Sequence, residues 1–382
     1  MTCLVAAGDP SGDLLAAAIL GEARRFLPPP ARRFWGIGGP CLAAMGARLI
    51  DRIERFGTSG LSEAAVRLPR NAALLARLMA AAERRPPEVA VLVDYPDFNL
   101  VLGPALARLG TRIVYLLPPQ VWAWRRGRLA RMAAFVDAVA ASFPFEVEIH
   151  RAAGMRAEFV GHPLLLTDPY RDPPGPAREG GAPVVAFLPG SRIHEVRNVL
   201  PAMAGAARLL IRRVPGIRCV LAPGPGVPPR VVRDAIGGGP RIPFDREPAA
   251  KALSGASAAV VHAGTATLEA ALLGVPSIVV ARTSRVTWEV ARRLVRVPHV
   301  ALPSIVLGRR VFEERLQDEV RPDAIARDLE RLIADAGAGE ATRRAGLELR
   351  RILSHEDPGR ALARLMAGGR PGGPLPAARV LS

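Results

Sequence analysis

The chain has 382 residues and a formal net charge of +17, and arginine carries nearly all of the positive charge because Lys251 is the only lysine. This length fits about two or three domains, and no apolar run reaches the roughly 18 residues of a transmembrane helix. Three widely spaced cysteines exclude a disulfide framework, and the six histidines lack metal-ligand spacing, so we expect no metal site. The basic charge favours phosphate-bearing partners, but nucleic acid is not expected because no basic run is interleaved with aromatic residues.

The first residues predict a βα unit and show no signal peptide. Cys3 to Ala7 reads as a buried strand, a polar glycine turn follows over residues 8–13, and a helix is expected from Leu14 to Phe26. Ser11 is the candidate N-cap of that helix. The turn is either a plain connection or faces a ligand at the carboxyl edge of a parallel sheet. A second strand is expected from Arg33 to Ile37.

The stretch from Phe56 to Leu78 mixes apolar residues with arginines. A helix here could bury its apolar side in the core, or it could rest on an anionic membrane surface. The pattern leaves both open.

A further buried strand, Val89 to Val93, ends in the polar sequence DYPDFN, and a helix is expected from Leu100 to Leu109. Carboxylates at the carboxyl end of a strand lie where α/β enzymes keep their chemistry. Asp97 could therefore cap the following helix or act as a general base.

Trp122 and Trp124 follow a predicted strand, Arg112 to Leu117, and lie next to arginines. They are either structural anchors or an apolar wall beside a sugar or an acyl chain. The segment from Thr167 to Pro183 is rich in proline, glycine and charged residues without periodicity, which is typical of a linker.

The βα pattern restarts after that linker. Val184 to Leu188 predicts a strand, and Arg192 in the following turn is either an anion-binding residue or a surface arginine. Farther along, Val260 to Ala281 reads as a strand, a glycine turn, a helix and a strand. The helix begins near Gly264 to Thr267, where free N–H groups and threonine hydroxyls could hold a diphosphate. Glu269 could then accept hydrogen bonds from ribose hydroxyls, or the pattern could be an ordinary capping box.

The sequence thus predicts an α/β protein with two Rossmann-like domains whose parallel sheets face each other across a cleft. We expect an N-terminal domain over residues 1–166 and a C-terminal domain over residues 183–340. The C-terminal helices and tail, residues 341–382, are expected to pack back on the N-terminal domain.

Eight short motifs, taken in order, resemble those of the bacterial lipid-A-disaccharide synthases, which are glycosyltransferases with the GT-B fold. The motifs are AGDPSGD (7–13), GIGGP (36–40), DYPDFN (94–99), QVWAWR (120–125), PFE (144–146), VGHPL (160–164), LPGSR with Glu195 following (188–192) and GTATLE (264–269). The family transfers a 2,3-diacylglucosamine from UDP to the 6-hydroxyl of 2,3-diacylglucosamine 1-phosphate with inversion. The resemblance implies no cofactor. It also implies a peripheral place on the cytoplasmic face of the inner membrane, and leaves open whether the chain forms a homodimer.

The resemblance also implies roles for residues. Asp97 matches the position of the catalytic base. The donor-binding residues would be Gly190, Ser191, Arg192, Glu195, Gly264, Thr265, Ala266, Thr267, Glu269 and Gln317. The acceptor-side residues would be Ser11, Gly12, Asp13, Gly38, Gly39, Asn99 and Trp122.

Some residues depart from the family pattern. His262, Ser304 and Glu313 stand where the family commonly has other residues, and the last two put details of donor contact in doubt. Two alternative functions, which do not involve this reaction, also fit the sequence. One is another UDP-N-acetylglucosamine enzyme of the same fold, either a MurG-like transferase or a 2-epimerase. The other is a non-catalytic basic protein that binds anionic lipid.

Overall fold

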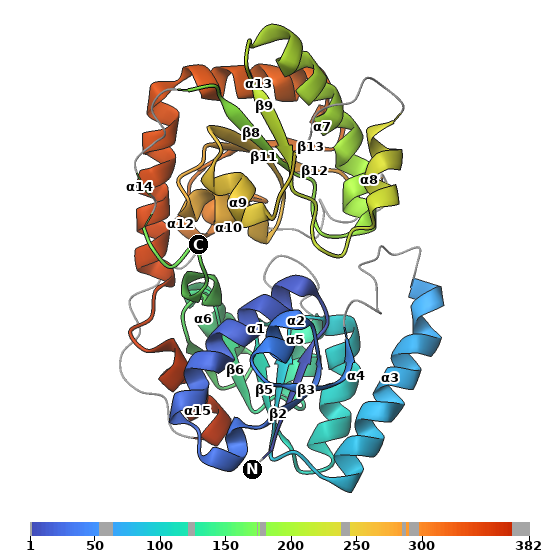
Figure 1. Ribbon diagram of the computed structural model, residues 1–382. Coiled ribbons are helices and arrows are strands. Elements are labelled where there is room, and N and C mark those ends of the chain that lie inside the picture. The colour runs from blue at the N-terminus through green and yellow to red at the C-terminus, as the bar shows by residue number, and fades with distance from the viewer. Residues whose placement is uncertain are drawn as a thin grey trace. The chain divides into compact units, whose positions relative to one another are not determined.

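The computed structural model describes residues 2–52, 64–120, 127–173, 175, 181–237, 245–284, 288–289 and 298–368. Two compact units make up the chain (Figure 1). Unit 1 contains the described residues up to Thr167 together with those from Leu353 onward, and unit 2 runs from Asp168 to Ile352. The expected boundary at residue 340 therefore differs from the structure, which keeps the following helical residues up to Ile352 in unit 2.

Unit 1 is built on a parallel sheet of seven strands in the order β3-β2-β1-β4-β5-β6-β7. Its strands are β1 (Cys3–Ala7), β2 (Phe34–Gly38), β3 (Arg48–Arg52), β4 (Val89–Val93), β5 (Arg112–Leu116), β6 (Ala138–Ala141) and β7 (Ala157–Phe159). Its helices are α1 (Pro10–Ala23), α2 (Pro40–Ala44), α3 (Ala64–Arg84), α4 (Pro96–Ala107), α5 (Gly127–Ala133), α6 (Pro144–Ala152) and α15 (Pro358–Ala367). Short 3-10 turns cover Arg24–Phe26, Pro29–Arg32 and Pro163–Leu166.

Successive side chains along each strand point to opposite faces of the sheet, which divides the core of unit 1 into two layers. In β1, Val5 points into the layer that holds α1 and α15, whereas Leu4 points into the layer that holds α3, α4 and α6. Both faces of a fully parallel sheet are covered in this way, which explains why the strands read as continuous apolar runs. Helix α3 buries Leu74 and Leu78 in this core, so that part of the predicted Phe56–Leu78 helix packs inside the protein. Residues 53–63 of the same stretch lie outside the described residues.

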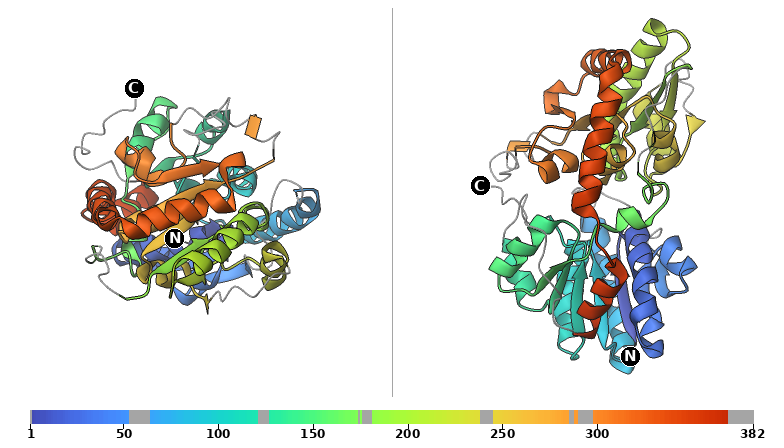
Figure 2. Two further views of the ribbon diagram at one scale, coloured as in Figure 1. Left: turned by 90° about the horizontal axis from the view of Figure 1, so that it is seen from above. Right: turned by 90° about the vertical axis from the view of Figure 1, so that its left-hand side faces the viewer.

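Helix α15 returns to unit 1 from the far end of the chain and packs beside α1 (Figure 1; Figure 2). Its side chains Leu362, Leu365 and Met366 are fully buried. Arg112 at the start of β5 donates from Nε to the carbonyl of Leu365 at 3.0 Å. The return of this helix completes one layer of the core of unit 1.

Unit 2 contains a second parallel sheet, of six strands in the order β10-β9-β8-β11-β12-β13. Its strands are β8 (Val184–Leu188), β9 (Arg218–Leu221), β10 (Asp245–Arg246), β11 (Ala258–His262), β12 (Ser277–Ala281) and β13 (Glu313–Leu316). Its helices are α7 (Ile193–Arg213), α8 (Pro229–Ile236), α9 (Ala249–Ser254), α10 (Thr265–Leu272), α12 (Leu302–Leu307), α13 (Pro322–Ala334) and α14 (Ala336–Leu353), with a 3-10 turn at Gln317–Glu319. Helices α7, α8 and α13 cover one face of the sheet.

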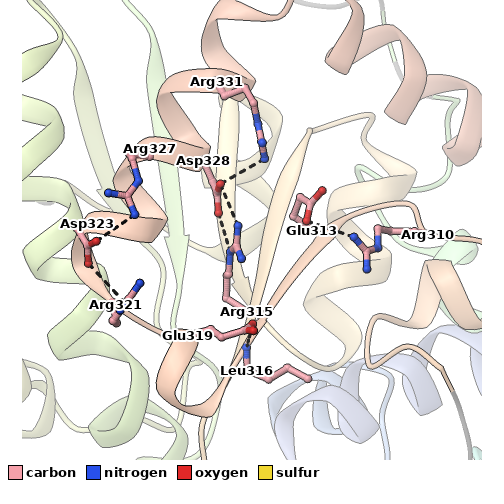
Figure 3. A network of polar contacts seen from close by, with 10 residues as sticks. All are labelled: Arg310, Glu313, Arg315, Leu316, Glu319, Arg321, Asp323, Arg327, Asp328 and Arg331. Carbon is pink, nitrogen blue, oxygen red and sulfur yellow. Dashed lines mark hydrogen bonds and ion pairs between the residues drawn. The ribbon is translucent and has the colours of Figure 1, made fainter.

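A group of ion pairs fastens the edge strand β13 to helix α13. Asp328 is buried and accepts from Nε and Nη2 of Arg315 at 2.8 and 3.2 Å, and from Arg331 at 3.3 Å (Figure 3). A bidentate guanidinium–carboxylate contact fixes direction as well as distance. Strand β13 is thereby held in register at the end of the sheet, next to the loop that carries Gln317.

Candidate functional site

The carboxyl edge of the unit 1 sheet carries a strained turn between β4 and α4. Asp94 and Tyr95 both have positive φ values, 40° and 43°, which is uncommon for residues other than glycine and costs energy. The Asp94 carbonyl accepts from the Tyr115 hydroxyl and from Nδ2 of Asn99, both at 2.8 Å. Asn99 is fully buried, and its Nδ2 donates to this turn and to the carbonyl of Ala6 in β1. Its side chain therefore supports the carboxyl edge of the sheet from inside the protein.

Asp97 does not cap helix α4, because the helix starts at Pro96 and its N-cap is Tyr95. The sequence expectation placed this start four residues too late, so the capping alternative is wrong. The Asp97 side chain is 80% exposed, and its Oδ1 accepts from Nη2 of Arg128 on α5 at 2.8 Å. Arg128 and Arg131 line a shallow hollow beside Asp97. Sequence reasoning missed Arg128, since nothing in the local pattern links α5 to α4.

Two neighbouring turns of unit 1 are joined by one carboxylate. Asp9, and not the expected Ser11, caps helix α1, because its Oδ1 accepts from the N–H of Gly12 at 2.6 Å. Asp13 is 1% exposed and accepts from the backbone N–H groups of Gly39, Cys41 and Leu42 at 2.7, 2.9 and 3.2 Å.

Strands β1, β2 and β4 are neighbours, so the sheet brings the turns after them to one edge. Of the predicted acceptor-side residues, Ser11 and Gly12 lie in the first turn of α1, Gly38 ends β2, and Gly39 follows it at the start of α2. Trp122 lies outside the described residues.

In unit 2, the loop between β8 and α7 folds around Glu195. Its Oε2 accepts from the N–H groups of Ser191 and Arg192, both at 3.1 Å, and its Oε1 contacts Nη1 of Arg192 at 2.8 Å. Gly190 has φ +104°, and a Cβ there would lie 2.5 Å from the Glu195 carboxylate, so only glycine fits. Burial alone would raise the pKa of Glu195, but the neighbouring His262 and the charge and hydrogen bonds of Arg192 hold it below its usual value.

The loop between β11 and α10 lies beside it, because β8 and β11 are adjacent strands. His262 ends β11 and places Nδ1 4.0 Å from Oε2 of Glu195. Burial lowers the pKa of His262, and the nearby charge of Glu195 opposes that shift. This residue, which departs from the family pattern, thus lies between the two loops.

Helix α10 begins without a side-chain cap. Its N-cap is Gly264, with φ +149°, so the alternative of an ordinary capping box is excluded. Thr265 and Ala266 form the first turn and are partly exposed. Thr267 is fully buried, donates to the Gly264 carbonyl at 2.7 Å and accepts from the N–H of Leu302 at 3.2 Å, so it joins α10 to α12.

One further predicted donor residue, Gln317, lies at the same edge of the sheet. Gln317, after β13, accepts from the N–H of Thr283 at 3.2 Å and so connects β13 to the end of β12. Ser304 is fully buried and accepts from the N–H of Val311 at 3.0 Å, so it takes a structural position. Glu313 lies in β13 and pairs with Arg310 at 3.5 Å.

The two loops after β8 and β11 have features that suit an anion. Helix N-termini carry N–H groups without intrahelical partners and a positive dipole end, and α7 and α10 both begin here, with Glu195 already accepting from the N–H groups of Ser191 and Arg192. Arg192 adds a guanidinium whose side chain is half exposed. Within the described residues, no group of three or more histidine, cysteine, aspartate and glutamate side chains is arranged to hold a metal ion.

The family model described as lipid-A-disaccharide synthetase matches residues 3–357. The lipid-A-disaccharide synthase of Myxococcus xanthus is 39% identical over 335 residues, which cover 86% of this chain and 87% of that protein. The synthase of Geobacter metallireducens is 35% identical over 350 residues, or 90% of each chain.

Solved structures with the same fold are more distant in sequence. A calicheamicin glycosyltransferase has a TM-score of 0.57 at 22% identity and covers 96% of this chain and 97% of its own. A putative UDP-N-acetylglucosamine 2-epimerase from Listeria monocytogenes has a TM-score of 0.64 at 12% identity, with 94% and 93% covered. These likenesses establish the GT-B fold. Together with the family match over nearly the whole length, they show that the chain belongs to the lipid-A-disaccharide synthase family of GT-B glycosyltransferases.

Proposed function

We propose that this protein transfers a 2,3-diacylglucosamine from UDP to the 6-hydroxyl of 2,3-diacylglucosamine 1-phosphate, forming the lipid A disaccharide and releasing UDP. The family match supports this reaction, since the relatives that carry the name span nearly the whole chain. The acceptor oxygen bonds to C1 of the donor sugar while the bond from C1 to the diphosphate oxygen breaks. The electron pair leaves with UDP, and the hydroxyl proton passes to a base.

Asp97 is the proposed base, and its setting is the observation that carries this assignment. Its carboxylate follows the buried strand β4, is exposed, and has one oxygen oriented by Arg128. Among the described residues only Arg128 contacts it, so Oδ2 is available to take a proton. Tyr95 holds the N-cap position of α4, so Asp97 does not serve as the helix cap. The acceptor would lie along the start of α1, with Ser11 and Gly12, and along the end of β2, with Gly38 and Gly39. Asp13 and Asn99 would hold this edge in place, and Trp122 would lie beside it.

UDP is proposed to bind unit 2, along the loops that begin α7 and α10. The diphosphate would lie at Gly190, Ser191 and Arg192 and at the N-terminal turn of α10, formed by Gly264, Thr265 and Ala266. Glu195, Thr267 and Gln317 would hold these loops, and Glu269 would contact the ribose. Charge-assisted contacts of this kind strengthen as the leaving group gains charge, which is how they would lower the barrier.

The test compares Asp97→Asn with Asp323→Asn. Both aspartates occupy the second position of a helix after a proline, and both pair with an arginine, so the second variant controls for the loss of one charge. An asparagine cannot take the proton, and turnover should fall by about 10²- to 10⁴-fold in Asp97→Asn only. UDP affinity and melting temperature should match the control, because an exposed ion pair contributes about 0–1 kcal/mol. Turnover retained in Asp97→Asn would refute the base assignment.

Binding to the cytoplasmic face of the inner membrane is proposed as well. No helix in the described part of the chain is both long and apolar enough to cross a bilayer. The acyl chains of both substrates place them in a membrane, and a net charge of +17 attracts anionic lipid. The protein should sediment with phosphatidylglycerol vesicles at low salt and be released at high salt. Failure to bind those vesicles at low salt would contradict this proposal.

A further inference from the structure

A tyrosine from the predicted linker reaches helix α10 of unit 2. Tyr170 follows the first residues of unit 2 and is 2% exposed. Its hydroxyl donates to Oε2 of Glu269 at 2.5 Å. Glu269 lies four residues after Thr265, so both side chains are on the same face of the helix. The linker segment therefore touches the helix whose N-terminus we assign to the nucleotide.

The segment that carries Tyr170 is itself held by helix α14. Arg350 donates from Nη1 to the carbonyl of Arg171 at 2.7 Å, from Nη2 to the carbonyl of Tyr170 at 2.6 Å, and also to the carbonyl of Asp172. The planar guanidinium presents its donors in a fixed fork, so three contacts to successive carbonyls fix the backbone. Tyr170 is thus anchored at its backbone by one helix and bonded at its hydroxyl to another.

The contact leaves one oxygen of Glu269 available. The Tyr170 hydroxyl occupies Oε2, and no described residue donates to Oε1. Burial raises the pKa of Glu269, and the hydrogen bond from Tyr170 opposes that rise. A carboxylate that is oriented and charged accepts hydroxyl groups more strongly than one that is mobile or protonated.

We infer that Tyr170 is a positioning residue of the donor site, which orients Glu269 so that Oε1 accepts from the sugar hydroxyls of the nucleotide. Arg350 supports it by fixing the backbone of residues 170–172. This inference rests on the proposed binding of UDP at α10, and it adds to that site two residues that lie outside every motif of the sequence. Neither residue touches the ligand, and each acts through Glu269.

The experiment measures the affinity of Tyr170→Phe for UDP and for 2′,3′-dideoxyuridine diphosphate, which lacks both sugar hydroxyls, by calorimetry between pH 5.5 and 8. The variant should bind UDP about tenfold more weakly at pH 7, because Glu269 loses the contact that orients it and then accepts more weakly from the sugar hydroxyls. It should bind the dideoxy analogue as the unaltered protein does. The pH below which UDP affinity falls should move upward, since the pKa of Glu269 rises without the hydroxyl.

Thr111→Val is the matched control, because it removes another buried hydroxyl, bonded at 2.9 Å to the carbonyl of Pro87, from unit 1. It should leave both affinities unchanged. Arg350→Lys should weaken UDP binding in the same direction as Tyr170→Phe, since an ammonium cannot hold three carbonyls in one plane. Equal weakening of UDP and the dideoxy analogue in Tyr170→Phe would overturn the inference, as would unchanged UDP binding. Absence of UDP binding by the unaltered protein would instead refute the donor site, and the inference with it.

Discussion

Replacing Asp13 by asparagine should show whether its carboxylate stabilises unit 1 or contacts the substrate. The resemblance to the family implies that Asp13 is an acceptor-side residue, but both of its oxygens are used inside unit 1. Oδ1 accepts from the N–H groups of Gly39 and Leu42, and Oδ2 accepts from that of Cys41. An asparagine has only one acceptor oxygen. Its NH₂ group would therefore face the N–H of Cys41 with no acceptor between them.

The cost follows from this geometry. Asp13 is 1% exposed, so water cannot replace the missing acceptor. A buried donor left unsatisfied costs about 1–3 kcal/mol, and two donors are affected, the N–H of Cys41 and the new amide, so we expect a loss of about 2–6 kcal/mol. For a domain of about 150–250 residues, each kcal/mol lowers the melting temperature by about 2–4 °C. The transition of unit 1 should therefore fall by roughly 4–24 °C.

Calorimetry of the full chain tests this value, and Asp9→Asn is its control. Asp9 uses a single oxygen, to cap α1 through Gly12, and asparagine caps a helix about as well as aspartate. Asp9→Asn should therefore melt close to the unaltered protein, while Asp13→Asn melts well below it. Equal melting temperatures for the two variants would refute the reasoning. If Asp13→Asn loses turnover but keeps its stability, the result would support the contact with the substrate that the resemblance implied.

Further predictions concern acid stability and the anion-binding loop. The pKa of both His150 and His162 is about 4 because burial disfavours the charged ring, so below about pH 6.5 only the unfolded chain takes up these protons. Each histidine should lower the free energy of unfolding by about 2 kcal/mol at pH 5, and a urea midpoint equal at pH 7 and pH 5 would contradict this. Gly190→Ala should weaken UDP binding by tenfold or more, since a Cβ collides with the loop carboxylate, and calorimetry with UDP would measure it. Arg192→Ala should reduce turnover and UDP affinity. Arg213→Ala is the control, because Arg213 lies at the other end of α7 and its side chain is 45% exposed, against 48% for Arg192. It should change neither quantity.

The sequence predicted the strands well wherever a parallel strand is buried on both faces, because such strands are short apolar runs. The run of β4 is an example, and its bounds are those of the structure. Strand β13 has the sequence EERL and lies at the edge of its sheet, so its charged side chains gave no apolar run. The structure identifies this strand by its pairing with β12 and by the contact of Arg315 with Asp328, neither of which is visible in the local sequence.

Errors in the candidate site have two physical origins. Helices α1 and α4 begin at Pro10 and Pro96, and proline favours the first helical position, so the residue before each proline was the better prediction for the cap. The contacts of Arg128 with Asp97 and of Tyr170 with Glu269 join residues far apart in the chain. Local periodicity carries no information on such pairs. The single aromatic residue in an otherwise polar linker was the one signal that pointed to Tyr170.

The placement of α15 has a consequence for how the chain folds as it is synthesised. Unit 2 is continuous over the described residues from Asp168 to Ile352, but one layer of the core of unit 1 stays incomplete until Leu362 and Leu365 have been added. The ribosome adds about 200 residues between Thr167 and Ala367, which takes about 10–40 s at about 5–20 residues per second. During that interval the first half of the protein exposes the apolar surface of α1, β5 and β6 against which α15 later packs. The half that is made first therefore finishes folding last, and the nascent chain depends on chaperones for longer than one whose domains fold in order of synthesis.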